Sequence, residues 1–527
     1  MVDHTGQVAQ SWLLPGEVGT NEIVSRLDSS LRWEITVDDR QEITLYDTFD
    51  WQLWFQNLVF YRLDSTCILC DCNRFSSDES SNEPIASCEP LEQVPRFWWD
   101  WPEGGMRDEL RGIIGLRALL PLTTLGVATH RAALRTEDDK TVTRLLFQRF
   151  VRVTERREQI LGMCRVLPIR GYDRERGSIE ENLARLGFPR IDTPPLQMIL
   201  TQTGHRPQPW SSKPTTSISP ELTAREATRR LASASLDICR DCEQGIIDDL
   251  DTEFLHDYRV SLRRVRSLLK LVKEVYPRNL TAQTISELSQ FARQTNRLRD
   301  LDVFLIDREQ HAEHVPGELA HCLDKMFGDL NAERDEQQHS VSSRLQSDAY
   351  RRSISQVQGV FAEAKWWPVT VNSHVPVASL ANQLIPRRYR KICRMISRIS
   401  TQSPDAQVHD VRLEAKKLRY LVEFFGTLYV PELVMPLTKR LKSIQRVLGT
   451  FNDLAVQQEF LRGYVYNQVA GQADSHELTL AVGSLVGILH QRQKAVRSEL
   501  NAHLAEFADK NTKSMVQQLT DDRRLAA

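Results

Sequence analysis

The chain has 527 residues, of which 41% are hydrophobic and 26% are charged. These ordinary globular proportions exclude a mostly disordered, collagen-like or low-complexity chain, and the length favours two to four domains. The net charge of −2 conceals an asymmetry, because residues 1–104 carry 19 Asp and Glu against 6 Lys and Arg and leave +11 for the remaining residues, which favours an anionic partner for that basic part.

The first third of the chain is rich in strand-like patterns. Two short runs, residues 42–48 and 58–63, are rich in aromatic and β-branched side chains, and residues 141–153 form a long run of the same character. A Ser-rich acidic segment at residues 64–96 interrupts them, and we interpret it as a surface insertion. Residues 178–186 predict a closing helix. We therefore predict an N-terminal domain over residues 1–188 that is built mainly from strands.

Four cysteines of this region, Cys67, Cys70, Cys72 and Cys88, are close in sequence. Thiolates at CxxCxC spacing with a fourth cysteine can converge on a tetrahedral zinc ion, although the second CxxC pair of a zinc ribbon is absent. Zinc binding and ordinary reduced thiols are therefore two open interpretations. Nine cysteines in 527 residues are too few for a secreted disulfide scaffold.

The chain changes character between residues 189 and 220, where seven prolines lie among Ser and Thr. Proline removes backbone donors and disfavours helix before it, so this segment is interpreted as an interdomain linker. Beyond it, amphipathic blocks with helical periodicity follow one another. They predict an all-α domain at residues 221–510 and a C-terminal tail at 511–527. The clearest blocks are residues 223–244, 257–275, 280–298, 385–400, 410–425 and 437–448.

The helical part contains an internal repeat. The segment HDYRVSLRRVR at residues 256–266 returns as HDVRLEAKKLR at residues 409–419, an offset of 153 residues. The correspondence continues without a gap to Val303 and Val456. Such self-similarity predicts two related helical bundles, and a pseudo-twofold axis would place equivalent helices face to face.

Each copy of the repeat carries a row of cations. Arg259, Arg263, Arg266 and Lys270 fall at helical spacing on one face over about 16 Å, and Arg412, Lys416 and Arg419 repeat the row. Like charges at this spacing destabilise a helix by a few tenths of a kcal/mol unless something neutralises them. Repetition of the row therefore predicts a polyanion, whereas a single row would be interpreted as a solvated face.

The composition and the neighbouring segments also favour a polyanion as the ligand. Of the 68 cations, 54 are Arg, whose planar fork matches phosphate oxygens, although a GC-rich genome would also explain the excess. Further cations lie at residues 387–398 and 439–446. Single-stranded nucleic-acid binders interleave aromatic residues with cations, and here only Tyr258 and Tyr389 do so, which favours phosphate without bases.

The two HDxR segments, together with residues 293–303 and residues 441–454, resemble the CHAD domain. The resemblance implies an α-helical domain that binds inorganic polyphosphate through a basic central channel. It also implies that His256 and His409 match the histidines for which the family is named, although hydrogen bonding at the helix start is the role we favour for them. Asp300 and Asp453 are expected to orient arginines. The predicted polyphosphate-binding residues are His256, Arg259, Arg263, Arg264, Arg266, Lys270, Arg297, Arg299, Arg387, Arg390, Lys391, Arg394, His409, Arg412, Lys416, Lys417, Arg419, Lys439, Lys442 and Arg446.

The N-terminal part resembles a degenerate CYTH domain, the triphosphate tunnel fold, through YDTFDWQLW at residues 46–54 and shorter segments after it. The resemblance implies an antiparallel β-barrel. Active members of that family open with an ExExK strand that binds a divalent metal, and residues 12–17 carry one Glu and a proline instead. We expect no hydrolysis, because too few hard oxygen ligands remain for Mg²⁺ or Mn²⁺. Arg62, Arg131, Arg135 and Arg144 are candidate phosphate contacts, or ordinary exposed strand positions.

The sequence thus predicts a polyphosphate-binding protein that docks on polyphosphate granules, with an α+β two-domain chain, no cofactor and no catalytic residue. A metal-dependent triphosphatase or polyphosphatase and a nucleic-acid-binding protein are the alternatives. No apolar run is long enough to span a membrane and no signal peptide is evident, so a cytoplasmic location is expected. The oligomeric state does not follow from the sequence.

Overall fold

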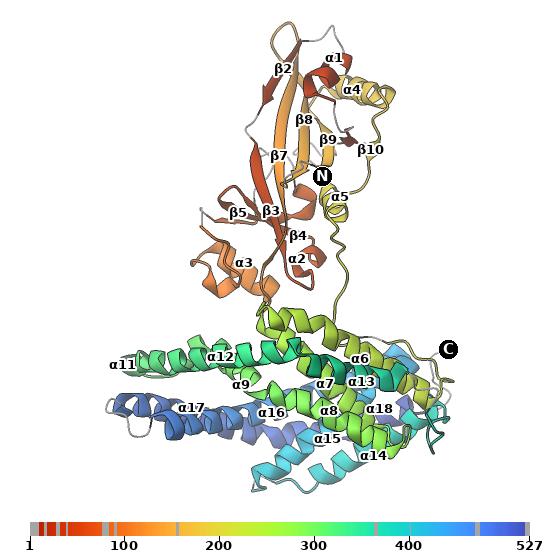
Figure 1. Ribbon diagram of the computed structural model, residues 1–527, viewed down its shortest axis with the longest axis vertical. Helices are drawn as coiled ribbons and strands as arrows, with labels where there is room; N and C mark the ends of the chain where they lie inside the picture. The colour runs from red at the N-terminus through yellow and green to blue at the C-terminus, as the bar shows by residue number, and fades with distance from the viewer. Residues whose placement is uncertain are drawn as a thin grey trace. The chain divides into compact units, whose positions relative to one another are not determined.

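The computed structural model describes residues 10–14, 18–27, 32–37, 40–75, 84–88, 92–153, 158–214, 216–362, 367–400, 402–469 and 475–521. The chain divides into two compact units, Met1–Ser211 and Ser212–Ala527. The first unit holds the strands and the second is helical (Figure 1). Within the described residues, no helix is both long and apolar enough to cross a membrane.

The first unit is organised around an antiparallel sheet. Its strands follow the order β10-β1-β9-β8-β7-β3-β4-β5-β6, and β2 pairs with β7 outside this path. Within the described residues β10 and β6 are edges that do not pair with each other, so the predicted barrel is not closed. The strands are β1 Gln10–Leu13, β2 Arg32–Val37, β3 Gln41–Asp47, β4 Leu58–Leu63, β5 Thr66–Asp71, β6 Ala86–Cys88, β7 Leu120–Arg135, β8 Thr141–Arg152, β9 Gln159–Leu167 and β10 Arg190–Ile191.

Two predictions for this unit need correction. The segment interpreted as a surface insertion supplies β5 and β6, in which Cys67 and Leu69 are fully buried. Its Ser-rich acidic composition hid an alternating apolar pattern in TCILCD at residues 66–71. The Pro-rich segment interpreted as a linker holds a short helix, α5 Pro195–Gln202, because Pro194 and Pro195 stand at a helix start, where proline is tolerated.

Helices cover both faces of the sheet through apolar contacts. Leu196 and Ile199 of α5 pack with Phe150 and Met163 of the sheet, while Ile179 of α4 packs on the other side of these strands with Phe147. The remaining cluster joins α3 to β4 and β5. The helices of this unit are α1 Thr20–Leu27, α2 Gln52–Phe55, α3 Gly105–Ile114, α4 Asp173–Arg185 and α5 Pro195–Gln202.

The second unit consists of helices, in agreement with the sequence pattern (Figure 1). Its longest members are α16, which continues through the predicted block at residues 437–448, and α17. The helices are α6 Ala224–Ile247, α7 Thr252–Leu271, α8 Arg278–Gln294, α9 Asn296–Ile306, α10 Arg308–Glu313, α11 Gly317–Ala320, α12 Cys322–Gln346, α13 Asp348–Ala362, α14 Val377–Ile396, α15 Asp405–Phe425, α16 Pro431–Tyr464, α17 Ser475–Phe507 and α18 Lys510–Leu519.

The 153-residue offset pairs elements as well as residues. Helix α6 corresponds to α14, α7 to α15, α8 and α9 together to α16, and α12 to α17. The two copies also contact each other through equivalent hydrogen bonds: the Ala224 amide donates to the Val375 carbonyl at 2.8 Å, and the Val377 amide donates to the Leu222 carbonyl at 2.8 Å. Because 224 and 377, like 222 and 375, are equivalent positions, these reciprocal bonds have the form of a local twofold contact.

Candidate functional site

The two repeated basic helices, α7 and α15, pack against each other. The Arg263 Nε of α7 donates to the Tyr420 hydroxyl of α15 at 2.9 Å. The next residue of α7, Arg264, forms an ion pair of 3.0 Å with Glu423, which lies one turn after Tyr420 on α15. The start of α7 is fixed by Asp251, whose carboxylate accepts from the Glu253 and Phe254 amides, as expected of an N-cap residue.

Five cations meet where the two helices approach, and we call Arg259, Arg263, Arg266, Arg412 and Lys416 the central basic cluster. Burial, together with the positive charges of Arg412 and Arg263, lowers the pKa of Lys416 to about 8. Burial and nearby arginines, Arg263 among them, also lower the pKa values of Arg259, Arg266 and Arg412. Arg263 therefore stands at the centre of a cluster drawn from both copies of the repeat.

The cluster is incompletely neutralised. Arg412 has one carboxylate nearby, Asp453 at 3.5 Å, and the side chains of Arg266 and Lys416 form no ion pair with any described residue. The Nε atoms of Arg266 and Arg412 are buried without a hydrogen-bond partner. Buried cations without matched acceptors are costly, so this arrangement favours an anionic ligand that supplies them.

Arg259 is more constrained than its equivalent, Arg412. Its guanidinium donates to the Ala292 carbonyl at 2.7 Å, to the Thr295 hydroxyl at 2.7 Å and to the Asn296 side chain at 2.9 Å. Thr295 is where α8 ends and α9 begins, whereas the equivalent helix α16 is continuous. Arg259 thus satisfies a carbonyl at this helix break.

The two histidines make equivalent contacts. The His256 Nδ1 lies 3.1 Å from the Arg299 guanidinium, and the His409 Nδ1 lies 2.8 Å from the Asn452 side-chain oxygen. Positions 299 and 452 are equivalent in the repeat. The histidines therefore link α7 to α9 and α15 to α16. They lie in the second turn of helices that begin at Thr252 and Asp405, so their hydrogen bonds join two helices and do not have the predicted place at a helix start.

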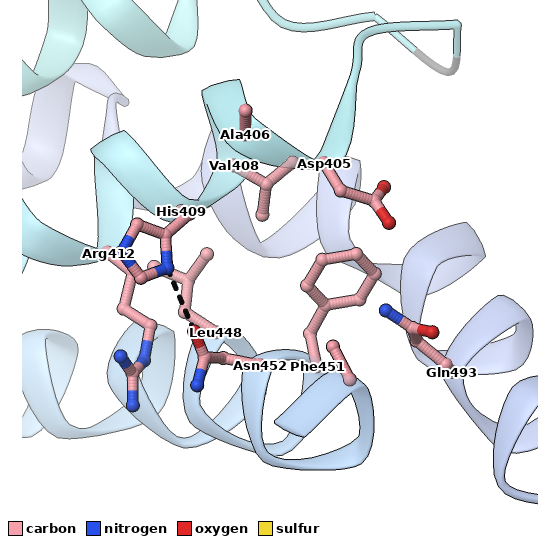
Figure 2. Close-up of a pocket in the computed structure, with 10 residues that line it drawn as sticks. Asp405, Ala406, Val408, His409, Arg412, Leu448, Phe451, Asn452 and Gln493 are labelled. Atoms are coloured by element: carbon pink, nitrogen blue, oxygen red, sulfur yellow. Dashed lines mark hydrogen bonds between the residues drawn. The ribbon is translucent and has the colours of Figure 1, made fainter. Parts of the chain in front are cut away.

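A cavity of about 180 Å³ lies beside His409 and Arg412 (Figure 2). In the first copy, the guanidinium of Arg299 reaches the Thr252 carbonyl at 3.3 Å at the equivalent place. The shorter Asn452 side chain does not fill this space in the second copy. The cavity is lined by Asp405, Ala406, Val408, His409, Arg412, Leu448, Phe451, Asn452, Ala455 and Gln493.

Several other predicted phosphate-binding cations form ion pairs with carboxylates of the same unit. Glu414, nearly buried, pairs with Lys391 at 3.0 Å and with Lys417 at 2.7 Å, and Glu333 binds Arg297 through two oxygens at 2.5 Å. Arg419 lies 3.2 Å from Glu423. These cations, with Arg264, are neutralised inside the unit.

The remaining predicted cations are exposed on helices α7, α14 and α16. Arg390 donates to the Pro386 carbonyl of its own helix, and the others form no ion pair with a described residue. These exposed cations are Lys270, Arg387, Arg390, Arg394, Lys439, Lys442 and Arg446.

Two members of the site, Arg293 and Tyr420, are not among the residues predicted from the sequence. Arg293 of α8 adds its positive charge beside Arg266, and its position in the repeated segment was the available signal. Tyr420, which is buried, accepts the bond from Arg263. Nothing in the sequence alone distinguishes Tyr420 from an ordinary core residue.

A group of possible metal ligands, Glu253, His256 and Asp257, lies beside this site, but its surroundings do not favour a bound cation. The side chains of Glu253, His256 and Asp257 place ligand atoms within 4.8 Å of one another. However, His256 already contacts the guanidinium of Arg299, and this positive charge opposes a second cation there. We assign no metal to this group.

The candidate phosphate contacts of the first unit lie on two faces of its sheet. Arg131, Arg135 and Arg144 share one face by register, and Arg135 is paired with Glu34 at 2.5 Å. Arg62 lies on the opposite face, opposite Thr44, and donates to the Asp64 carbonyl. Because side chains alternate along a strand, these four arginines do not converge on one phosphate.

The same alternation divides the four cysteines. Cys67 is buried on the face packed by α3, with Cys88 opposite it on the neighbouring strand. Cys70 and Cys72 are buried on the other face. The four thiols therefore do not converge on one zinc ion, which corrects that interpretation.

The family model of the CHAD domain matches residues 225–462, from α6 to α16. A solved CHAD domain from the plant Ricinus communis is 23% identical, with a TM-score of 0.47, and the match covers 55% of this chain and 95% of that one. PptA from Streptomyces chartreusis is 17% identical, with a TM-score of 0.38, and the match covers 56% of this chain and 100% of that one. No curated protein matches this chain.

Proposed function

Because residues 225–462 form a CHAD domain, we propose that the helical unit binds inorganic polyphosphate through the central basic cluster. The observation that carries this proposal is the meeting of two repeated cationic rows with few carboxylates between them. A polyphosphate chain presents closely spaced negative charges, and its oxygens would supply the acceptors that Arg266 and Arg412 lack.

The aromatic residues near the rows favour phosphate over bases. Tyr258, Tyr389 and Tyr420 are all buried, with exposed fractions of 1%, 3% and 5%. Bases stack on exposed aromatic faces, and none of these three rings offers one. A nucleic acid would therefore gain charge contacts here but no stacking.

For the first unit we propose a non-catalytic role as a partner of the binding domain, with granule docking as the role of the whole chain. Strand β8 lies in the middle of the sheet and carries the exposed Arg144 and the half-buried Arg149 on opposite faces, with no carboxylate along its length. Hard divalent cations need clustered oxygen ligands to position a phosphoryl group. The absence of carboxylates holds for β8, all of whose residues the structure describes.

The test is a titration of the full-length protein with long-chain polyphosphate at about 0.15 M salt, a physiological ionic strength. Arg263→Ala combined with Lys416→Ala should weaken binding about 100-fold, since a hydrogen bond to a charged group contributes about 1.5–3 kcal/mol and 1.4 kcal/mol is tenfold. The slope of log affinity against log salt should also fall by about 0.7–0.9 for each phosphate that the variant no longer neutralises.

The matched control is Arg229→Ala combined with Arg230→Ala on α6, which removes the same charge. Both arginines are paired with Glu226, at 2.7 and 2.8 Å, so their removal should change affinity less than about threefold. Equal effects of the two double variants would indicate diffuse attraction and contradict the proposal. Binding of single-stranded DNA or RNA as tight as that of polyphosphate, or metal-dependent phosphate release, would favour the nucleic-acid or enzyme alternative.

A further inference from the structure

At the start of two long helices of the second unit, three side chains of different metal-ligand types come together. His321 and Cys322 stand where α12 begins, and Glu477 lies in the first turn of α17. The Cys322 Sγ is 3.5 Å from the His321 Nε2 and 3.8 Å from the Glu477 Oε2. All three ligand atoms lie within 4.8 Å of one another.

These spacings are those of a tetrahedral zinc site. Zinc lies about 2.3 Å from a thiolate sulfur, about 2.0–2.1 Å from an imidazole nitrogen and about 2.0–2.2 Å from a carboxylate oxygen, so tetrahedral angles place the sulfur about 3.5–3.7 Å from the other two ligand atoms. The observed separations of 3.5 and 3.8 Å require adjustments of a few tenths of an ångström. Thiolate, imidazole and carboxylate together suit zinc better than Mg²⁺ or Ca²⁺.

The backbone that carries the ligands is held by apolar packing. Leu323 and Leu478, the residues that follow Cys322 and Glu477, are buried in one cluster that joins α12 to α17. These two helices lie side by side (Figure 1) and are equivalent in the 153-residue repeat, since α12 begins at residue 322 and α17 at residue 475. A site on such elements is positioned before a metal arrives.

We propose that His321, Cys322 and Glu477 bind one Zn²⁺ ion, which links the first turns of α12 and α17 and thereby the two halves of the repeat. Three protein ligands leave a fourth position for water or another oxygen ligand. The site is separate from the central basic cluster, so it does not depend on the proposed polyphosphate function.

The experiment is a titration of reduced full-length protein with Zn²⁺ in competition with a chromogenic chelator, and with Co²⁺ as a spectroscopic probe. The wild type should bind one Co²⁺ with the sulfur charge-transfer and tetrahedral d–d bands of a thiolate site. Cys322→Ser should lose these bands and weaken the Zn²⁺ affinity at least about 100-fold, because even changes around the ligands cost 10–100-fold. Glu477→Gln should weaken binding while keeping the sulfur band.

Cys393→Ser, which removes another half-buried thiol, is the matched control and should leave metal stoichiometry and bands unchanged. Hydrogen exchange gives a second measurement: Zn²⁺ should slow exchange at the starts of α12 and α17 in the wild type and not in Cys322→Ser. Unchanged metal binding in Cys322→Ser, or a Co²⁺ spectrum without a sulfur band in the wild type, would overturn the proposal.

Discussion

Lys416 is the residue of the central basic cluster whose charge is most sensitive to its surroundings. It is half-buried, and burial together with Arg412 and Arg263 brings its pKa to about 8, well below the ordinary 10.5 of lysine. The arginines around it keep their charge at any physiological pH. Lys416 is therefore the member of the cluster that can lose its charge near neutral pH.

This pKa gives the proposed binding a pH dependence of known sign. A polyanion binds the charged form of Lys416, so binding raises its pKa and takes up protons. Polyphosphate affinity should accordingly be highest below pH 8 and fall as the pH rises from 7 to 9, by up to about tenfold per unit above the free pKa. Lys416→Arg, which stays charged, should flatten this profile in titrations at constant ionic strength. The same slope in both proteins would contradict the assignment.

At the scale of elements, helix α15 has a second face on which charges are balanced. Glu414, whose side chain is 6% exposed, is held by Arg388, Lys391 and Lys417. Burial raises the pKa of Glu414, but hydrogen bonds from Lys417 and the other two cations outweigh it and lower the pKa to about 2. Helix α15 thus directs one cationic face towards α7 and uses the other to hold α14.

Removal of the Glu414 charge should therefore destabilise the helical unit. Glu414→Gln leaves three cations around a neutral side chain, and breaking one partner of a buried pair costs about 3 kcal/mol at pH 7. A depressed carboxyl pKa contributes stability that is present above the ordinary pKa of 4.5 and is lost as the pH falls towards 2. Urea unfolding followed by helical circular dichroism should show this loss between pH 5 and 3 in the wild type only.

The control for this experiment is Glu432→Gln, a change at an exposed position in the first turn of α16. It should alter the free energy of unfolding by less than about 0.5 kcal/mol. If Glu414→Gln had no larger effect than Glu432→Gln, the ion cluster would contribute nothing to the packing of α14 on α15.

Helical periodicity and the 153-residue offset were sufficient to predict the cationic faces of α7 and α15. They did not predict which cations are neutralised, because Glu333 and Glu423 reach Arg297 and Arg264 from other helices. Partners of this kind depend on how helices pack, which a periodic pattern does not encode. The His321–Cys322–Glu477 group was missed for the same reason, since 155 residues separate Cys322 from Glu477.

In the first unit, the Ser-rich acidic composition of residues 64–96 led to a wrong prediction of a surface insertion. Serines and acids around β5 suggested a surface loop, although the strand itself alternates buried and half-buried residues. Spacing alone also suggested a cysteine cluster, because a CxxC pair would be adjacent in a turn. In a strand, Cys67 and Cys70 point to opposite faces. The open sheet reflects strand pairing over long sequence distances, which local patterns do not determine.

At the scale of the whole molecule, the charges are divided between the two units. The 19 acids against 6 bases in residues 1–104 all belong to the first unit, whereas the central basic cluster belongs wholly to the second. Acidic charge repels a polyanion over about one Debye length, which is about 8 Å at 0.15 M salt and about 30 Å at 0.01 M. The influence of the first unit on binding should therefore grow as the salt concentration falls.

This division predicts how a fragment of residues 212–527 should behave. It contains every residue of the central basic cluster and the apolar cluster that joins α12, α16 and α17, so it should fold and bind polyphosphate within about threefold of the full chain at 0.15 M salt. At 0.01 M salt it should bind more tightly than the full chain, because the acidic residues are gone. Fluorescence anisotropy with labelled polyphosphate at both salt concentrations measures this difference. If the folded fragment bound polyphosphate tenfold more weakly than the full chain at 0.15 M salt, arginines of the first unit would contact the polyanion. The role of the first unit as a non-catalytic partner would then include polyphosphate binding.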